Sequence, residues 1–146
     1  MRRSEGGFLI SKIHQLSGRI FNKLLKEYNI DFNSAQGRIL FVLWQGDGIP
    51  IGELSRKTQL SKSTLTSMLD RLEAAEHIVR EHDIEDRRNI LIKLTEENRS
   101  QKQRYDKVSE EMTEIFYEGF TEEDIEDFEN YLRRALENLQ RRAIAG

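Results

Sequence analysis

Two adjacent arginines, Arg87 and Arg88, stand in the segment "DIEDRRNILIKLT", residues 83–95. A guanidinium stays charged and presents its N–H donors in a fixed plane, so an exposed arginine suits carboxylates and phosphates. Three carboxylates precede the pair within the same segment. We expect one arginine to be braced by a carboxylate and the other to point outward, where it can hold an anion. Plain surface salt bridges are the alternative, and they stabilise a protein little.

A second cluster, "SKSTLTS" at residues 61–67, combines small hydroxyl side chains with one lysine. On a helix, small hydroxyls allow close approach to base edges and can bond to bases or phosphates. The lysine adds charge near a helix N-terminus, which already favours phosphate. A solvated helix face has the same composition, so this cluster alone does not distinguish a DNA-contacting helix from an ordinary surface helix. The candidate DNA contacts from both clusters are Lys62, Ser63, Thr64, Ser67, Arg71, Arg87 and Arg88.

Two helices separated by a tight turn must position the second cluster. "GELSRKT" predicts a short helix, "QLS" makes the turn, and Ser61 caps a second helix through "KSTLTSMLDRLEAAE". The apolar face of this second helix consists of Leu65, Met68, Leu69 and Leu72. The pattern is typical of a helix-turn-helix, although an ordinary helical hairpin in a bundle fits two such helices equally well.

A predicted two-stranded antiparallel hairpin must position the arginines. "IVREHD" and "NILIKLT" alternate and are rich in β-branched residues, and "IEDRR" lies between them as the tip. A hairpin directly after the second helix is the layout of a winged helix, in which the helix reads the major groove and the wing reaches the backbone or minor groove. The predicted fold class is therefore mainly α with a small β-hairpin wing, an α+β winged helix-turn-helix.

Further helices flank this core. Apolar residues recur at helical spacing from Phe8 to Asn29, and "AQGRILFVLW" follows a cap at Asn33 or Ser34. Thr95 with Asn98 begins another long helix. Thr121 with Asp124 resembles the capping box of a last helix.

The two terminal helices have long apolar stripes. These run over Leu9–Leu24 and Ile125–Leu139. A single small domain cannot cover both stripes, so we expect a homodimer in which the N- and C-terminal helices are dimerisation helices.

Length, charge and composition narrow the function classes. At 146 residues the chain fits one domain, and without cysteine it has neither disulfides nor thiolate metal sites. The net charge is −3, but residues 50–95 carry eight basic and eight acidic side chains, whereas residues 96–146 carry eight and fourteen. Because DNA requires only local positive potential, the acidic C-terminal third does not exclude it. The expected location is the cytoplasm, with no membrane contact.

Catalytic and metal sites find no support in the sequence. It has neither a nucleophile elbow nor a phosphate-binding glycine loop, and with three histidines and no cysteine the supply of metal ligands is thin. His77 and His82 are five residues apart, which puts them on opposite faces of an extended segment. We therefore expect no enzyme, no catalytic residues, no metal and no cofactor.

The segment "LSKSTLTSMLDRLEAAEHIVREHDIEDRRNILIKLTEE" resembles the core of the multiple antibiotic resistance regulator (MarR) family of winged-helix repressors. The specific features are "LDRLE", Arg80, the "DRR" of residues 86–88 and "LT" at residues 94–95. With "NSAQGRIL" and the terminal helices, the resemblance covers nearly the whole chain. It divides the single domain, residues 1–146, into a winged-helix core at 33–95 and dimerisation helices at 8–30 and 96–146.

The sequence departs from the family pattern at two positions. The family often has glycine where this chain has Glu76 and Asn98. Asparagine tolerates the left-handed backbone conformation, and glutamate adopts it poorly. We therefore expect the helix end at Glu76 to be built differently.

The resemblance implies a homodimeric transcriptional regulator, commonly a repressor, that binds a pseudo-palindromic operator in double-stranded DNA. It also implies release by small aromatic or anionic ligands such as phenolic carboxylates. A basic group beside aromatics suits such a ligand, and the candidates are His14, Arg19, Tyr28, Arg38 and Trp44, although core packing is the simpler role for Tyr28 and Trp44. The alternative function is a winged-helix protein-interaction dimer that does not bind DNA. The operator, the regulated genes, the natural ligand and the arginine that faces DNA do not follow from the sequence.

Overall fold

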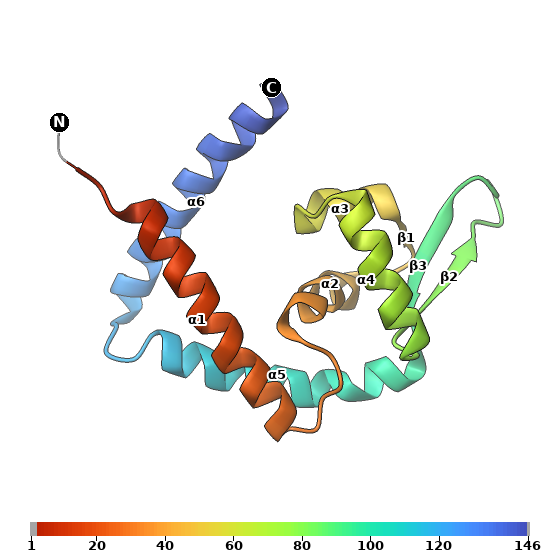
Figure 1. Ribbon diagram of the computed structural model, residues 1–146, viewed down its shortest axis with the longest axis horizontal. Coiled ribbons are helices and arrows are strands. Elements are labelled where there is room, and N and C mark those ends of the chain that lie inside the picture. Colours follow the sequence, from red (N-terminus) through yellow and green to blue (C-terminus); the bar gives the residue numbers. More distant parts are fainter. Residues whose placement is uncertain (1–2, 146) are drawn as a thin grey trace. The chain divides into compact units, whose positions relative to one another are not determined.

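The computed structural model describes residues 3–145 and is mainly helical with a small antiparallel sheet, as the sequence predicts (Figure 1). Its elements are α1 (Gly6–Glu27), α2 (Ser34–Gln45), β1 (Ile49–Pro50), α3 (Ile51–Thr58), α4 (Lys62–Ala74), β2 (Ile78–His82), β3 (Ile90–Leu94), α5 (Glu96–Phe116) and α6 (Glu122–Ala145). The chain divides into a larger compact unit that ends at Glu110 and a smaller one that begins at Glu111.

The core of the larger unit gathers apolar side chains from α2, α3, α4 and the sheet. Leu65, Leu69 and Leu72 of α4 are fully buried, so the apolar face predicted for this helix is confirmed, with Met68 half-buried at its edge. An aromatic group extends this core, in which the Trp44 and Tyr105 rings lie 4.7 Å apart between centroids. Burial raises the pKa of Tyr105 to about 12.

The helices begin where the sequence predicts. The Asn33 side chain accepts a bond from the Gln36 N–H, and the Gln36 side chain accepts one from the Asn33 N–H, so α2 has a full capping box. Ser61 Oγ accepts from the Thr64 N–H at 3.2 Å at the start of α4. These side chains satisfy N–H groups that have no partner within the helix.

The sheet has three strands in the order β1-β3-β2, one more than predicted. β2 and β3 form the expected hairpin, with Ile78 opposite Leu94 and His82 opposite Ile90. Two residues before α3, Ile49 and Pro50, add a short edge strand to β3. Proline tolerates this edge position because it has no N–H to leave unpaired.

The expectation about Glu76 is wrong. Glu76 adopts the left-handed conformation, with φ of 66°, directly after α4 ends. The neighbouring contacts hold it there: the His77 N–H donates to the Leu72 carbonyl at 2.9 Å, and Thr95 Oγ1 donates to the Glu76 carbonyl at 2.6 Å. The helix end therefore has the geometry that glycine favours, built with a glutamate.

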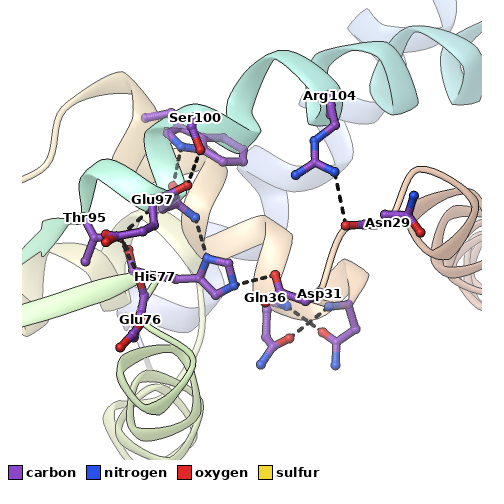
Figure 2. A network of polar contacts seen from close by, with 12 residues as sticks. Asn29, Asp31, Gln36, Glu76, His77, Thr95, Glu97, Ser100 and Arg104 are labelled. Carbon is purple, nitrogen blue, oxygen red and sulfur yellow. Dashed lines mark hydrogen bonds and ion pairs between the residues drawn. The ribbon is translucent and has the colours of Figure 1, made fainter.

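A buried polar network joins the end of α4 to α2, α5 and the segment after α1 (Figure 2). The Trp44 indole N–H donates to Asn98 Oδ1 at 2.8 Å, which leaves the Asn98 amide to donate to His77 Nδ1 at 3.0 Å. His77 Nδ1 is therefore an acceptor, and the ring proton is on Nε2. That atom lies 2.9 Å from Asp31 Oδ1, although the carboxylate is off the N–H direction and the contact is not a hydrogen bond.

The smaller unit contains the end of α5 and the whole of α6. Thr121 and Asp124 form the predicted reciprocal cap, with bonds of 3.0 and 3.1 Å. Phe116, Tyr117, Phe120 and Phe128 pack in a cluster of rings, and Tyr117 donates to Glu129 at 2.7 Å. The α6 side chains Leu132, Leu136 and Leu139 remain exposed.

Candidate nucleic-acid interface

Helices α3 and α4 form a helix-turn-helix whose turn is fixed by several bonds. Gln59 takes the left-handed conformation at the end of α3, with φ of 61°. Ser55 Oγ donates to the Leu60 carbonyl at 2.5 Å, and the Leu60 N–H donates to Thr58 Oγ1 at 3.3 Å. The Arg38 guanidinium of α2 donates to the Thr58 carbonyl. The start of α4 is thus held from both α3 and α2.

The polar side of α4 is open to solvent. Lys62, Ser63, Thr64, Ser67 and Arg71 are all exposed, in agreement with their prediction as surface residues. Ser63, Ser67 and Arg71 are spaced by four residues, so they lie along one face of the helix. Within residues 3–145, Ser67 and Arg71 have no side-chain hydrogen bond or ion pair, whereas the hydroxyls of Ser63 and Thr64 contact Ser61 Oγ at 3.2 and 3.0 Å.

The two wing arginines differ in their contacts. Arg88 is braced by Asp86 through two bonds, Nε to Oδ1 and Nη2 to Oδ2, both 3.0 Å. These bonds lower the pKa of Asp86 below its usual value. The Arg88 side chain is nevertheless 89% exposed, so the donors not used by Asp86 face solvent. Arg87 is exposed and its guanidinium has no partner in the described part of the chain.

Arg80 joins the wing to α4, a role that the sequence analysis missed. Its guanidinium donates to Asp70 at 2.7 Å and Glu73 at 2.8 Å, and its N–H donates to Glu73 at 3.2 Å. The hydrogen bond from Arg80 lowers the pKa of Glu73. A strand residue thus fixes the angle between β2 and the helix whose outer face is the candidate interface. In the sequence, the feature that could have indicated this role is the pair of carboxylates, Asp70 and Glu73, three residues apart near the end of α4.

The five candidate ligand residues do not form one site. His14 and Tyr28 belong to the same helical stretch and are separated by about 21 Å along it, at about 1.5 Å per residue. Arg38 is used at the turn after α3, and the Trp44 N–H is used by Asn98. Arg19 is exposed on α1. A hollow of about 500 Å³ lies beside the end of α1 and the start of α2, and none of the five candidates lines it. Its lining residues are Asn22, Lys26, Ile30, Asp31, Phe32, Asn33 and Gln36.

Metal and membrane features are absent from the described residues. Within residues 3–145, no cluster of three or more histidine or acidic side chains could hold a metal ion. None of the helices in that range is long and apolar enough to span a membrane.

Comparison with known proteins points to one family. The family model described as "MarR family" matches residues 32–90, which contain α2 to the start of β3. The regulator TtmR of Methylorubrum extorquens is 35% identical over 89 residues, which are 61% of this chain and 45% of TtmR. The uncharacterised HTH-type transcriptional regulator YsmB of Bacillus subtilis is 33% identical over 100 residues, 68% of each chain. With 45% of TtmR matched, this chain spans less than half the length of that relative.

A solved structure extends the likeness beyond the matched core. The crystal structure of mutant MarR from E. coli complexed with operator DNA has a TM-score of 0.82 and 25% identity to this chain. The match covers 89% of this chain and 92% of that one.

Proposed function

The chain belongs to the MarR family of winged-helix transcriptional regulators, and from this premise we propose that it binds a pseudo-palindromic DNA duplex as a homodimer. A regulator of this kind works in the compartment that contains the DNA, which agrees with the cytoplasmic location expected from the sequence. The family and its relatives are regulators and not enzymes.

The observation that carries the proposal is the set of bonds that joins α4 to the wing. Arg80 bonds to two α4 carboxylates at 2.7 and 2.8 Å, and these bonds hold the first strand of the wing against the helix that bears the exposed face. We propose that Ser63, Thr64, Ser67 and Arg71 contact the major groove, with Lys62 on a phosphate. Arg87 and Arg88 then reach the backbone or the minor groove beside it.

A homodimer supplies the second half-site. Apolar side chains on α1 (Leu9, Ile13, Leu16 and Ile20) and on α6 (Leu132, Leu136 and Leu139) remain between 37% and 68% exposed. A second copy of the chain buries both stripes. Two-fold symmetry then demands matching half-sites, about 34–36 Å apart on one side of B-DNA.

The test is selection of duplexes from random sequence, followed by binding measurements over a range of salt. Arg88→Ala should weaken all duplexes alike and flatten the slope of log K against log salt by about 1.8 per dimer, because two phosphate contacts are lost. Ser67→Ala should change the preferred base pairs and leave the slope nearly intact. If no duplex is selected, or if the Arg87→Ala and Arg88→Ala variants both bind like the wild type, the protein-interaction dimer becomes the better function.

The proposal includes repression that is released by a small aromatic acid. The hollow beside α1 and α2 supports it, because Lys26 supplies a cation and Asn22, Asn33 and Gln36 supply polar groups. A ligand that binds one dimer geometry better than another shifts the spacing of the two α4 helices. Salicylate titrated against the DNA complex should weaken binding, and Lys26→Gln should reduce this response. No response to a varied panel of aromatic acids would remove the ligand part of the proposal.

A further inference from the structure

Four hydrogen bonds between its own residues hold the loop that carries the wing arginines. The Asp83 N–H donates to the Asn89 carbonyl at 2.9 Å, and the Asn89 N–H donates to the Asp86 carbonyl at 3.0 Å. Asp83 Oδ1 accepts from the Glu85 N–H at 3.0 Å, and Asp86 Oδ1 accepts from the Arg88 N–H at 3.2 Å. None of these four bonds involves the carbonyl of Arg87, which joins the two arginines in the chain.

That carbonyl is held from outside the loop. His82, the last residue of β2, has its Nδ1 atom 2.8 Å from the Arg87 carbonyl oxygen. A carbonyl can only accept, so Nδ1 must carry a proton in this contact. The imidazole is itself exposed, with its other nitrogen available to solvent or to a bound molecule.

We propose that His82 is a positioning residue that fixes the arginine turn for DNA and makes DNA binding pH-dependent. The proposal rests on the proposed function, since it concerns the same wing. An imidazolium always has a proton on Nδ1, whereas the neutral ring has it there in only one of two tautomers. Protonation of His82 therefore secures the bond to Arg87 and adds a positive charge beside the phosphates.

The charged groups around His82 determine the direction of the effect. Ile90 is opposite it on β3, and Lys93 of β3 is paired with Glu81 at 2.9 Å. In the loop Asp86 is paired with Arg88, and the other charged residues of the loop are Asp83, Glu85 and Arg87. DNA adds phosphates, which favour the charged imidazole. Histidine changes its charge between about pH 5 and 8, so affinity for DNA should rise as the pH falls through that range.

Substitutions at His82 separate positioning from simple charge. In His82→Asn the side-chain amide nitrogen takes nearly the place of Nδ1, so the bond to the Arg87 carbonyl can form without a titrating group. We expect His82→Asn to bind a selected duplex like the wild type at pH 8 and to show no gain at pH 6. His82→Ala should bind about fivefold more weakly at pH 8, the effect of one lost hydrogen bond, and should also show no gain at pH 6.

The measurement is fluorescence anisotropy of a labelled duplex at constant salt, with imidazole NMR of the free protein as a second readout. NMR should find the neutral His82 ring protonated on Nδ1. Equal binding by His82→Ala and the wild type, an unchanged pH response in His82→Asn, or a ring protonated on Nε2 would each overturn the role of His82 while DNA binding by the wild type stands. Failure of the wild type to bind any selected duplex would instead overturn the proposed function.

Discussion

Arg87 and Arg88 carry the same charge at neighbouring positions, but only Arg88 is oriented by a carboxylate. Its fork of two 3.0 Å bonds to Asp86 requires a planar guanidinium, which lysine lacks. Arg87 acts as an unpaired charge in the described part of the chain, and a lysine supplies that equally well.

Charge-conserving substitutions should therefore distinguish the two arginines. We expect Arg88→Lys to weaken binding to a selected duplex about tenfold, because the lysine cannot be braced by Asp86. Arg87→Lys is the matched control and should stay within about twofold of the wild type. Both affinities can be measured by anisotropy at one salt concentration. Equal losses in the two variants would contradict the orienting role of Asp86.

For single residues, the sequence predicted contacts between residues that are close in the chain and missed contacts between residues that are far apart in it. A carboxylate two residues from Arg88 could be predicted to brace it, and does. Arg80 meets carboxylates seven and ten residues away, which requires the angle between β2 and α4. The ligand candidates are not brought together within one copy of the chain, for a related reason. Aromatic and basic residues such as Trp44 and Arg38 also serve packing and capping, and their types alone do not distinguish these uses.

Asn98 is the residue on which the buried network depends. It is fully buried and bonds to both the Trp44 N–H and His77 Nδ1. Asn98→Ala leaves both groups buried without partners, so the free energy of unfolding should fall by about 2–4 kcal/mol. Urea unfolding measures this, with Gln103→Ala, an exposed position on the same helix, as a control that should change it by less than about 0.5 kcal/mol. A loss of that small size in Asn98→Ala would show that water replaces the amide.

Among the elements, the end of α4 contains a backbone strain that can be removed. Glutamate at φ of 66° adopts a conformation disfavoured by its Cβ, which glycine does not have. Glu76→Gly should therefore raise the free energy of unfolding by about 0.5–1 kcal/mol. Ala74→Gly, at the last residue of α4, should lower it by up to about 1 kcal/mol. Chemical denaturation of the two variants gives both values, and destabilisation by Glu76→Gly would mean that contacts of the glutamate outweigh the strain.

Element positions were predictable from caps and periodicity, whereas the third strand was not. The N-caps at Asn33 and Ser61 and the reciprocal pair Thr121 and Asp124 are local signals, and the structure has all of them. β1 is two residues long, and what makes it a strand is its pairing with β3, more than forty residues later. A pattern of alternation needs more residues than β1 has.

At the scale of the whole molecule, α1 exposes an apolar stripe that its own unit leaves uncovered. Leu24 and Leu25 at the end of the helix are buried, whereas Leu9 and Leu16 are each 50% exposed. Periodicity predicted the stripe, but periodicity alone cannot say whether the chain or a partner covers it. Exposed apolar side chains in a continuous row are typical of a surface that associates.

A charge placed in this row should separate the two copies of the proposed homodimer. Leu16→Glu puts a carboxylate where apolar surface is to be buried, opposite the same stripe of the partner, so sedimentation should find a smaller species. Because half-sites are read in pairs, the variant should also lose preference for a pseudo-palindrome over a single half-site. Ser11→Glu is the control, since Ser11 is exposed and lies about 140° around α1 from Leu16, at about 100° per residue. If wild type and Leu16→Glu sediment alike as folded monomers, the stripe has another partner and the operator need not be symmetric.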